Sequence, residues 1–323
     1  MPQRQLGMVI DLNKCIGCQA CTLACKTLWT DQEGMQHMYW NDVETKPGLG
    51  YPRDWEKLRG GFNKKRELQR GQLPDLSAYG IPWEYPYDEL GTGKSSYLKP
   101  NVQPTWGPNW EEGQGAGKYP NSYYFYLPRI CNHCSEPACA PSCPRQAVNK
   151  REKDGIVLID QERCRSYRYC LRNCPYKKIF FNNFTKTSQK CIFCYPRVEK
   201  GVGPACARQC VGRIRHVSFL DDKEGPVYQL AKEWKVALPL HPEFGTKPNV
   251  FYVPPTSPPK ISPEGRLLNE PRIPLSYLES LFGPEAGKAL ATLTVEIKKM
   301  RKGQRSDLLV ILQGRTYKDR LHF

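Results

Sequence analysis

Short apolar runs along this chain predict strands, and one longer segment near its end predicts helices. Gly7-Met-Val-Ile-Asp11, Gly155-Ile-Val-Leu-Ile-Asp160 and Arg215-His-Val-Ser-Phe219 are rich in β-branched and other apolar residues and are short enough for single strands. Residues 275–282 and 284–300 predict two helices, with a glycine between them as the break and proline at the first position of the second. The chain therefore combines separate short strands with helices.

Long stretches between these elements have little periodicity. Residues 26–125 are rich in Trp, Tyr, Gly and Pro, as in Met38-Tyr-Trp-Asn41 and Trp106-Gly-Pro-Asn-Trp110, and predict irregular structure with many turns. A loop of this length is usually functional or disordered, and the aromatic content argues against disorder. We interpret it as a partner-binding insertion, with a lid over the protein's own functional centre as the alternative. The proline-rich segments 239–245 and 253–260 predict extended chain that lies along a partner.

Composition narrows the class of protein. The chain has 323 residues, and no window approaches the run of about 18 apolar residues that a membrane span needs. The first residues form too short an apolar stretch for a signal peptide, so the chain alone is expected to stay in the cytoplasm. Its 15 cysteines are an odd number without a secretion signal, which favours metal binding over a disulfide framework.

All the cysteines fall into four motifs. Motif I is Cys15-x2-Cys18-x2-Cys21-x3-Cys25, motif II is Cys131-x2-Cys134-x4-Cys139-x3-Cys143-Pro144, motif III is Cys164-x5-Cys170-x3-Cys174-Pro175, and motif IV is Cys191-x2-Cys194-x11-Cys206-x3-Cys210. In ferredoxins, three close cysteines hold one cluster, and the fourth, often followed by proline, ligates the neighbouring cluster. Lys26 and Val211 replace that proline after motifs I and IV, which is a mild departure. Four cysteines within eleven residues do not suit one tetrahedral zinc ion, which makes zinc a remote alternative.

Distance along the chain predicts which motifs pair. Only residues 144–163 separate motifs II and III, as in a compact two-cluster ferredoxin, so motifs I and IV are left to pair around them. Exchange of the fourth cysteines then gives four ligand sets, which we number with their clusters. Set 1 is Cys15, Cys18, Cys21 and Cys210; set 2 is Cys25, Cys191, Cys194 and Cys206; set 3 is Cys131, Cys134, Cys139 and Cys174; set 4 is Cys143, Cys164 and Cys170.

Set 4 has three cysteines because Tyr167 occupies the position of the expected fourth ligand. Three thiolates suit a cube that lacks one iron, so we expect one [3Fe–4S] cluster in set 4 and three [4Fe–4S] clusters in the other sets. The alternative is a four-iron cluster whose odd iron takes water, hydroxide or the Tyr167 oxygen. A phenolate is a hard ligand and a poor substitute for thiolate in a soft site, which favours the three-iron cluster.

The formal net charge of +16 by itself suggests a nucleic-acid-binding protein, which the Cys-x2-Cys pairs would make zinc-dependent. Iron–sulfur clusters held by thiolates are negatively charged and offset part of this charge. Basic residues near a cluster stabilise its reduced form and raise its potential. The basic residues that flank the cysteines are Lys14, Lys26, Arg145, Arg163, Arg165, Arg168, Arg172, Lys190, Arg208 and Arg213. For each of them the alternative is an ordinary solvated surface residue.

The motif order, the long insertion after motif I and the tyrosine in motif III resemble the iron–sulfur beta subunits of molybdenum enzymes in the dimethyl sulfoxide reductase superfamily, the family of respiratory nitrate reductase. The chain is more similar still to the beta subunits of ethylbenzene and dimethylsulfide dehydrogenases and of selenate, chlorate and perchlorate reductases. The segments that carry this resemblance are Asp11-Leu-Asn-Lys-Cys-Ile-Gly-Cys18, Pro47-Gly-Leu-Gly-Tyr-Pro52, Tyr126-Leu-Pro-Arg-Ile-Cys-Asn-His-Cys134 and Val236-Ala-Leu-Pro-Leu-His-Pro-Glu-Phe-Gly245. Nitrate reductase beta subunits are much longer and have Trp where this chain has Tyr167.

The resemblance implies an electron-transfer subunit that has no catalytic residues of its own. Single electrons would pass along the four clusters, with cluster 1 nearest an alpha subunit that carries a bis-pterin molybdenum cofactor. Cluster 4 would lie nearest a gamma subunit with haem b or another acceptor. Similar beta subunits are carried folded into the periplasm by a twin-arginine signal on the alpha subunit. The alternative location is the cytoplasmic side of the inner membrane.

We therefore predict an α+β fold with two ferredoxin-like two-cluster modules. Residues 1–25 and 186–220 form the outer module with clusters 1 and 2, and residues 126–185 form the inner module with clusters 3 and 4. Residues 26–125 form the partner-binding insertion, and residues 221–323 form a C-terminal extension with helices. A beta subunit of another oxidoreductase class, such as formate dehydrogenase, hydrogenase or polysulfide reductase, is the alternative, but four complete sets of four cysteines would be typical of those classes.

Overall fold

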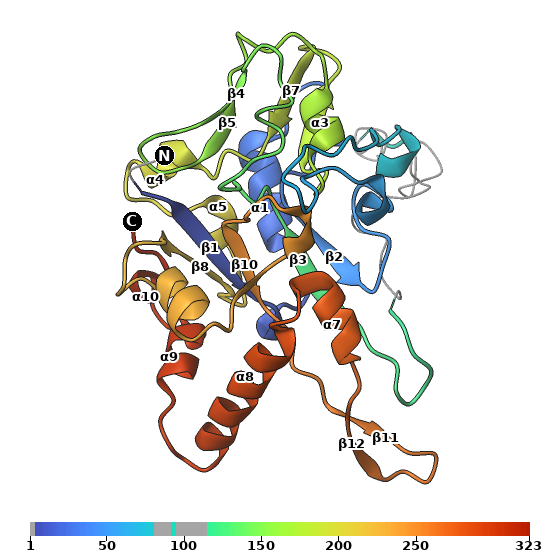
Figure 1. The fold of residues 1–323 in the computed structure, drawn as a ribbon, viewed down its shortest axis with the longest axis vertical. Helices are drawn as coiled ribbons and strands as arrows, with labels where there is room; N and C mark the ends of the chain where they lie inside the picture. The colour runs from blue at the N-terminus through green and yellow to red at the C-terminus, as the bar shows by residue number, and fades with distance from the viewer. Residues whose placement is uncertain (1–3, 81–91, 95–114) are drawn as a thin grey trace.

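A four-stranded mixed sheet lies at the centre of the molecule (Figure 1). The computed structural model describes residues 4–80, 92–94 and 115–323. The strand order is β8-β1-β10-β9, where β1 is Leu6–Asp11, β8 is Arg215–Phe219, β9 is Leu238–Pro239 and β10 is Val250–Val253. β1 is antiparallel to β8 and parallel to β10, and β9 is antiparallel to β10. All of β1 is buried, as expected for a strand covered on both faces.

The predicted strands that precede motif I and follow motif IV pair with each other, with Leu6 opposite Phe219 and Ile10 opposite Arg215. This pairing brings the two ends of the cysteine-containing region together. The sequence analysis missed β10, which lies beside β1 with Met8 opposite Val250. Val250–Val253 consists of β-branched and aromatic residues that favour a strand, so the signal was present in the sequence, whereas its pairing depends on a partner far away in the chain.

The other sheets in the described part of the chain are antiparallel pairs. They join β2 (Asp42–Lys46) to β3 (Phe125–Arg129), β4 (Val148–Lys150) to β5 (Val157–Ile159), β6 (Ile179–Asn182) to β7 (Thr187–Lys190), and β11 (Pro259–Ile261) to β12 (Leu267–Pro271). An isolated pair of strands is marginally stable in water, so each pair depends on what packs against it. The pairs β4–β5 and β6–β7 are flanked by the cysteine loops of motifs II, III and IV.

Short helices follow or carry the cysteines, and longer ones gather at the C-terminus. The helices near the cysteines are α1 (Ala20–Trp29), α3 (Tyr169–Asn173), α4 (Tyr195–Val198) and α5 (Ala205–Arg208). The C-terminal helices are α6 (Pro226–Tyr228), α7 (Leu275–Phe282), α8 (Ala286–Arg301), α9 (Asp307–Gln313) and α10 (Tyr317–Arg320). The single-turn segments are the 3-10 helices η1 (Leu12–Lys14), η2 (Trp55–Leu58), η3 (Ser77–Tyr79) and η5 (Pro242–Phe244), and the π-helical turn η4 (Gln229–Glu233).

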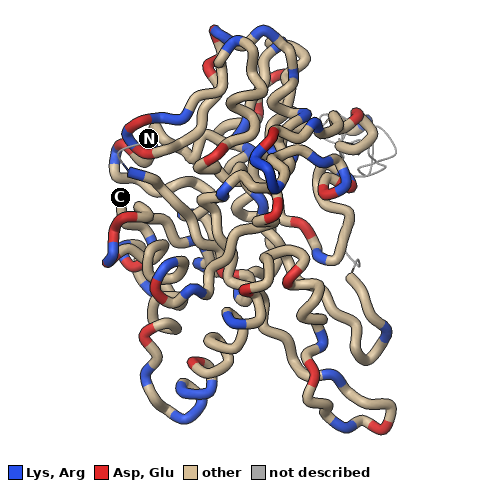
Figure 2. The backbone as a smooth tube through the Cα atoms, viewed as in Figure 1, with Lys and Arg blue, Asp and Glu red and all other residues tan. Residues whose placement is uncertain are grey.

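The two C-terminal helices of the sequence analysis are present. The bounds of α7 are those predicted, and Gly283, at a φ of +82°, ends it. The second helix begins at Ala286 and not at Pro284, because residues 284 and 285 form a turn after the break. α8 buries Ala289 and Leu293 and exposes the basic residues of its last turn. Figure 2 shows these basic positions along the chain at the lower end of the molecule.

The aromatic residues of the insertion that lie within the described ranges are mostly inside the protein. Trp40, Tyr51, Trp55 and Tyr79 are buried, so the expectation that such residues form an exposed contact surface is wrong for them. Trp106-Gly-Pro-Asn-Trp110 lies outside the described residues. Arg129 of β3 explains part of this burial, because its guanidinium lies 3.7 Å from the Trp55 ring centroid.

Buried ion pairs and hydrogen bonds hold the insertion against the neighbouring strands. Glu44 of β2 accepts hydrogen bonds from Arg129 Nε (2.5 Å) and from Trp55 Nε1 (3.2 Å). Lys46 lies 3.7 Å from Glu44 and 2.9 Å from Glu56, so the buried carboxylate of Glu44 faces two cations. Burial raises the pKa of Glu44, but Arg129 and Lys46 outweigh burial and lower it overall. Paired charges of this kind are the form in which ionised groups are tolerated in a protein interior.

Segment 239–245 also packs within this chain, although its prolines had suggested a partner-bound stretch. Leu240 and His241 are buried, and the His241 amide donates a hydrogen bond of 2.7 Å to the Leu281 carbonyl. In the parts of the chain that the structure describes, none of the helices combines the length and the apolar character of a membrane span. The described residues mix helix and strand, which agrees with an α+β fold.

Candidate metal centres

The cysteines predicted as set 2 come together around one cavity. Cys25 lies on α1, Cys191 and Cys194 lie in the loop after β7, and Cys206 lies on α5. All four line one small cavity together with apolar side chains that include Met8, Trp29 and Ile130. Burial raises the pKa of the Cys25 thiol well above its usual value, and the nearby thiols of Cys191, Cys206 and Cys194 raise it further.

The four cysteines predicted as set 3 surround a second cavity of similar size. Cys131, Cys134, Cys139 and Cys174 line a small cavity whose other walls are largely apolar. Burial raises the pKa of Cys139 well above its usual value, with further increases from the thiols of Cys174, Cys131 and Cys134. Motif II thus supplies three of these thiols and motif III supplies the fourth.

Three of the cysteines predicted as set 1 lie close together. Burial raises the pKa of Cys15 to about 12, and the neighbouring thiols of Cys21 and Cys210 contribute to the increase. Cys18, the remaining member, is exposed. Ile16, Leu23 and Val211 lie beside these cysteines in sequence and are 64%, 66% and 67% exposed. This end of the cysteine-containing region therefore carries apolar side chains at the protein surface.

The three cysteines predicted as set 4 also form a group. Burial raises the pKa of Cys170 to about 12, and the thiols of Cys164 and Cys143 add to the increase. Tyr167 is 53% exposed, and its ring is stacked against that of Tyr169, with 6.0 Å between centroids and 12° between planes. Motif III thus places an exposed phenol ring at the position where the other ferredoxin runs carry a cysteine.

The donor chemistry of these groups fits iron–sulfur clusters. Several of the thiols are buried and have raised pKa values, so a nearby positive charge is needed to hold them as thiolates, and bound metal supplies it. Thiolates are the soft ligands that iron–sulfur clusters require. Within the described ranges, no three His, Cys, Asp or Glu side chains converge on a point suited to one metal ion. Four thiols around a cavity are instead the arrangement that a polynuclear cluster needs.

Nitrogen donors point at several of these sulfur atoms. Trp29 Nε1 lies 3.1 Å from Cys194 Sγ, which connects the end of α1 to set 2. Backbone amides of Ala147 and Ser188 lie 3.3 Å and 3.4 Å from Cys143 Sγ and Cys164 Sγ, respectively. Hydrogen bonds to cluster sulfur atoms stabilise the more negative, reduced state, so these donors would raise the potentials of the groups that they contact.

Neighbouring groups of thiols lie next to one another in the order of their numbers. Between sets 1 and 2, the thiols of Cys21 and Cys210 help to raise the pKa of Cys206 to about 12, after the larger effect of burial. Between sets 2 and 3, the Cys131 thiol contributes to the raised pKa of Cys191. Sets 3 and 4 share a small apolar cluster that contains Cys139 and Cys170. A continuous line of thiol groups therefore runs through the protein.

The basic residues predicted to flank the cysteines divide into two classes. Lys14, Lys26 and Lys190 lie near thiols, where each is a charge neighbour of at least one cysteine. Lys190 is buried, and its ammonium donates to the carbonyl oxygens of Val157 and Cys191. The exposed members are Arg145, Arg163, Arg165, Arg168, Arg208 and Arg213, while Arg172 is half-buried. These exposed side chains fit the alternative of ordinary surface residues.

Arg215, a fully buried arginine at the first position of β8, is absent from the basic residues predicted near the cysteines. Its Nη2 lies 3.4 Å from Cys21 Sγ. The signal that could have revealed it is an arginine in a strand whose pattern is otherwise that of the core. A basic residue there needs a compensating negative group, and cluster ligands are the negative groups within reach.

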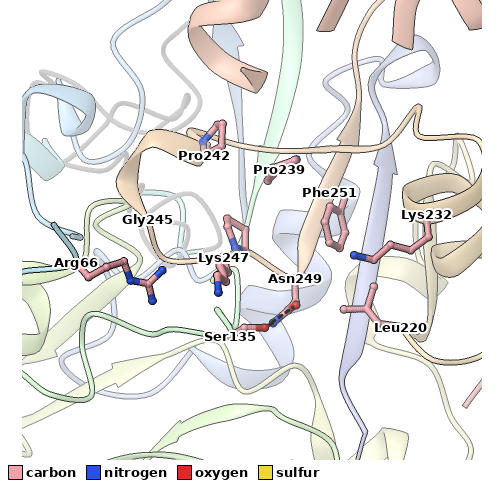
Figure 3. Close-up of a pocket in the computed structure, with 11 residues that line it drawn as sticks. Arg66, Ser135, Leu220, Lys232, Pro239, Pro242, Gly245, Lys247, Asn249 and Phe251 are labelled. Carbon is pink, nitrogen blue, oxygen red and sulfur yellow. Dashed lines mark hydrogen bonds between the residues drawn. The ribbon is translucent and has the colours of Figure 1, made fainter. Parts of the chain in front are cut away.

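A separate cavity beside the motif II loop contains no cysteine (Figure 3). Arg66 and Lys247 reach it from one side, but both form ion pairs with the carboxylate of Glu136. Ser135 and Asn249 on its floor are joined by a hydrogen bond of 3.2 Å. The cavity mainly marks the place where the chain before β10 packs along the loop of motif II.

Comparisons with known proteins agree with this chemistry. Residues 122–219 match the profile of a 4Fe-4S dicluster domain, and residues 6–27 match that of a 4Fe-4S binding domain. The chain is 58% identical to the dimethylsulfide dehydrogenase subunit beta of Rhodovulum sulfidophilum over 315 residues, which cover 97% of each protein. It is 57% identical to the selenate reductase subunit beta of Thauera selenatis, over 99% of each protein. It is 55% identical to the respiratory nitrate reductase subunit beta of Haloferax mediterranei, over 95% of this chain and 90% of that protein.

Proposed function

Because the chain belongs to the iron–sulfur beta subunits of the dimethyl sulfoxide reductase family of molybdenum enzymes, we propose that it relays single electrons through three [4Fe–4S] clusters and one [3Fe–4S] cluster. It is an electron-transfer subunit of an enzyme complex and not a catalyst by itself. When bound, each iron–sulfur cluster accepts or gives up one electron at a time. The residues of this chain hold, space and electrostatically tune those clusters.

The cavities with four cysteines each are the observation that carries this proposal. Motifs I and IV contribute to one cavity, and motifs II and III contribute to the other. Only the exchange of fourth cysteines between paired motifs produces such mixed groups. The same exchange assigns Cys210 to set 1 and Cys143 to set 4, and the thiol neighbours of Cys15 and Cys170 support both assignments. This pairing supports two ferredoxin-like modules, for which we propose residues 1–25 with 186–220 and residues 126–185; the β6–β7 strand pair crosses the bound between them.

The two ends of the line of thiols suit contact with partners. At the set 1 end, Cys18 is exposed and the apolar side chains of Ile16, Leu23 and Val211 face solvent. We assign this end to a molybdenum-containing alpha subunit, because exposed apolar groups beside the first cluster suit a close contact that excludes water. At the set 4 end, Tyr167, Tyr169 and Phe184 are exposed. We assign that end to a haem b gamma subunit or another acceptor.

The assignments of the insertion and of the cellular location rest on family resemblance. Several aromatic residues of the described part of the insertion are buried, but Tyr119 and Tyr124 are exposed, so a role in partner binding would fall to these two rings and to its exposed polar surface. We place the complex in the periplasm, to which the folded beta subunit would be carried together with the alpha subunit.

Metal analysis and electron paramagnetic resonance of the purified complex test the cluster content. We expect about fifteen irons in this chain, and a [3Fe–4S] signal in the oxidised protein that reports set 4. Tyr167→Cys restores a fourth thiol and should convert that cluster to four irons, with loss of the oxidised signal and a lower potential. Tyr169→Cys adds a thiol two residues away, next to the stacked ring, and should leave the signal unchanged.

Three results would contradict this assignment. Stoichiometric zinc without iron would exclude clusters altogether. Absence of a [3Fe–4S] signal from the wild-type complex would exclude the three-iron centre. An unchanged signal in Tyr167→Cys, with the new thiol accessible to the cluster, would mean that Tyr167 does not stand at the vacant ligand position.

A further inference from the structure

Arg215 is buried without a carboxylate partner in the described part of the chain. Its exposed fraction is 0%. Nη2 donates a hydrogen bond of 2.6 Å to Asn41 Oδ1 and lies 3.4 Å from Cys21 Sγ, while Nη1 lies 3.6 Å from Met8 Sδ. The Nε atom has no hydrogen-bond partner within the described structure. A buried guanidinium with one neutral acceptor is costly unless negative charge lies nearby.

That negative charge can come from two ligand sets at once. Burial lowers the pKa of Arg215, but the thiols of Cys21, Cys206 and Cys210 outweigh burial and raise it overall. Cys21 and Cys210 belong to proposed set 1, and Cys206 belongs to proposed set 2. Arg215 in turn lowers the pKa of Cys206, although burial, which is the larger effect, raises it. Geometry agrees, because Met8 and Asn41, which the guanidinium contacts, both line the cavity of the set 2 cysteines. The guanidinium therefore lies near both groups of thiols.

We infer that Arg215 is a shared counter-charge that raises the reduction potentials of clusters 1 and 2 together. This inference rests on the ligand sets of the proposed function. Reduction adds one negative charge to a cluster, and a fixed positive charge nearby stabilises the reduced form more than the oxidised form. Because the site is buried, water screens this effect weakly. One residue thus raises the potentials of two consecutive centres in the same direction, which changes the difference between them little.

Asn41 positions this charge without neutralising it. Its amide oxygen accepts from Arg215, and its amide nitrogen lies 3.4 Å from the Thr22 hydroxyl on α1. Asn41 and Thr22 are both buried, so the contact is held by packing as well as by hydrogen bonds. An aspartate in place of Asn41 would have nearly the same shape but would pair with the guanidinium. The neutral side chain leaves the positive charge available to the thiolates.

Redox titration of the anaerobically purified complex, monitored by electron paramagnetic resonance, tests the inference. In Arg215→Gln we expect two of the [4Fe–4S] midpoints to fall. At the wild-type midpoint potential, the reduced-to-oxidised ratio of each of these two clusters should fall about tenfold. This change corresponds to a midpoint shift of about 59 mV for one electron. The [3Fe–4S] midpoint should not change, because none of the set 4 thiols is among the charge neighbours of Arg215. Arg215→Lys keeps the charge and should restore most of the shift.

Arg213→Gln is the matched control, because it removes the same charge two residues earlier from an exposed side chain. We expect its midpoints to differ little from those of the wild type, since water screens an exposed charge. Iron content measured on every variant distinguishes failure of the proposed function from failure of the inference about Arg215. A wild-type complex without iron would refute the proposed function. Normal iron in Arg215→Gln with midpoints that match Arg213→Gln would overturn the inference alone.

The variant Asn41→Asp tests the same inference if the complex with Arg215→Gln does not assemble. The added carboxylate should pair with the guanidinium and lower the same two midpoints while the buried packing is kept. Unchanged midpoints in Asn41→Asp, with normal iron content, would overturn the inference. A fall of all four midpoints by the same amount would also overturn it, because a shared counter-charge acts on two centres only.

Discussion

At Gly17, between the first two cysteines of motif I, a side chain has no room. The residue has a φ of +68°, and a Cβ atom built there would lie 2.6 Å from the ring of Tyr126. L-residues other than glycine pay about 1–2 kcal/mol in this left-handed region, before any contact is considered. Backbone conformation and the tyrosine ring thus both require glycine in the loop that presents Cys15 and Cys18.

Gly17→Ala should therefore reduce both the stability of the complex and the iron that it retains. The matched control is Gly201→Ala, because Gly201 has the same φ of +68° and no atom within 4 Å of the place where a Cβ atom would lie. We expect the control to show only the cost of the backbone conformation, about 1–2 kcal/mol. Thermal unfolding and iron per chain measure the difference. Equal losses in the two variants would mean that the Tyr126 contact is unimportant.

At the scale of elements, His241 joins two short helices that are far apart in sequence. Its Nδ1 lies 2.7 Å from Glu243 in η5, and its Nε2 lies 3.1 Å from Glu56 in η2. Burial lowers the pKa of His241, but the hydrogen bonds to Glu243 and Glu56 outweigh burial and raise it overall. Burial raises the pKa of Glu56, while His241 and Lys46 bring it down to about 2. The insertion and the C-terminal extension thus share a charged contact.

This contact should make stability depend on pH. The pKa of His241 is higher in the folded protein than in the unfolded chain, so its contribution is complete below about pH 6.5 and is lost as pH rises through the folded value. Glu56 stays ionised throughout that range. We expect His241→Gln to cost about 1 kcal/mol at pH 6 and less at pH 9. Melting temperatures across this pH range measure the change.

His322→Gln is the control for this prediction, because His322 is more exposed and lies 3.9 Å from its nearest carboxylate. The melting temperature of the His322→Gln variant should equal that of the wild type at each pH. If the penalty of His241→Gln were the same at pH 6 and pH 9, the contact between η2 and η5 would not depend on the charge of the imidazole.

At the scale of the whole molecule, the two ends depend on metal to different degrees. The apolar cluster around β4, β5 and α3 contains Cys139 and Cys170 among its few buried residues. The cluster beneath α8 and α9 contains buried residues such as Val227, Leu293 and Leu308 and no cysteine. In Figure 1 the first region lies at the top of the long axis, whereas α8 and α9 lie at the bottom.

Removal of iron should therefore unfold the top of the molecule first. Without bound metal the cysteine loops lose the cluster that would join them, and strand pairs such as β4–β5 have little apolar packing of their own. We expect hydrogen exchange after chelation to increase over residues 138–181 before it increases over residues 286–313. Exchange at equal rates in the two regions would show that the cysteine-free core also depends on the clusters.

Much of the local structure could be predicted because it is specified by neighbouring residues. The spacing of three cysteines within a motif, the strand before motif I and the bounds of α7 all depend on short stretches of chain. The pairing of β10 could not be predicted, because the strand-forming composition of Val250–Val253 does not indicate that β1 lies beside it. The burial of Tyr51 and Trp55 was missed for a similar reason: Arg129 lies over the Trp55 ring and Phe180 stacks on the Tyr51 ring, and each is more than 70 residues away in sequence.

The sequence by itself determined the family, the iron–sulfur chemistry and the count of available thiols, since these follow from residue identity and from covalent spacing along the chain. Only the tertiary structure decided which charges stand among those thiols. Arg215 and Cys21 are separated by 194 positions in sequence, and only the packing of β8 against β1, beside α1, brings them within 3.4 Å. Electrostatic energy depends on distance through space and on burial, and neither quantity can be read from the order of residues.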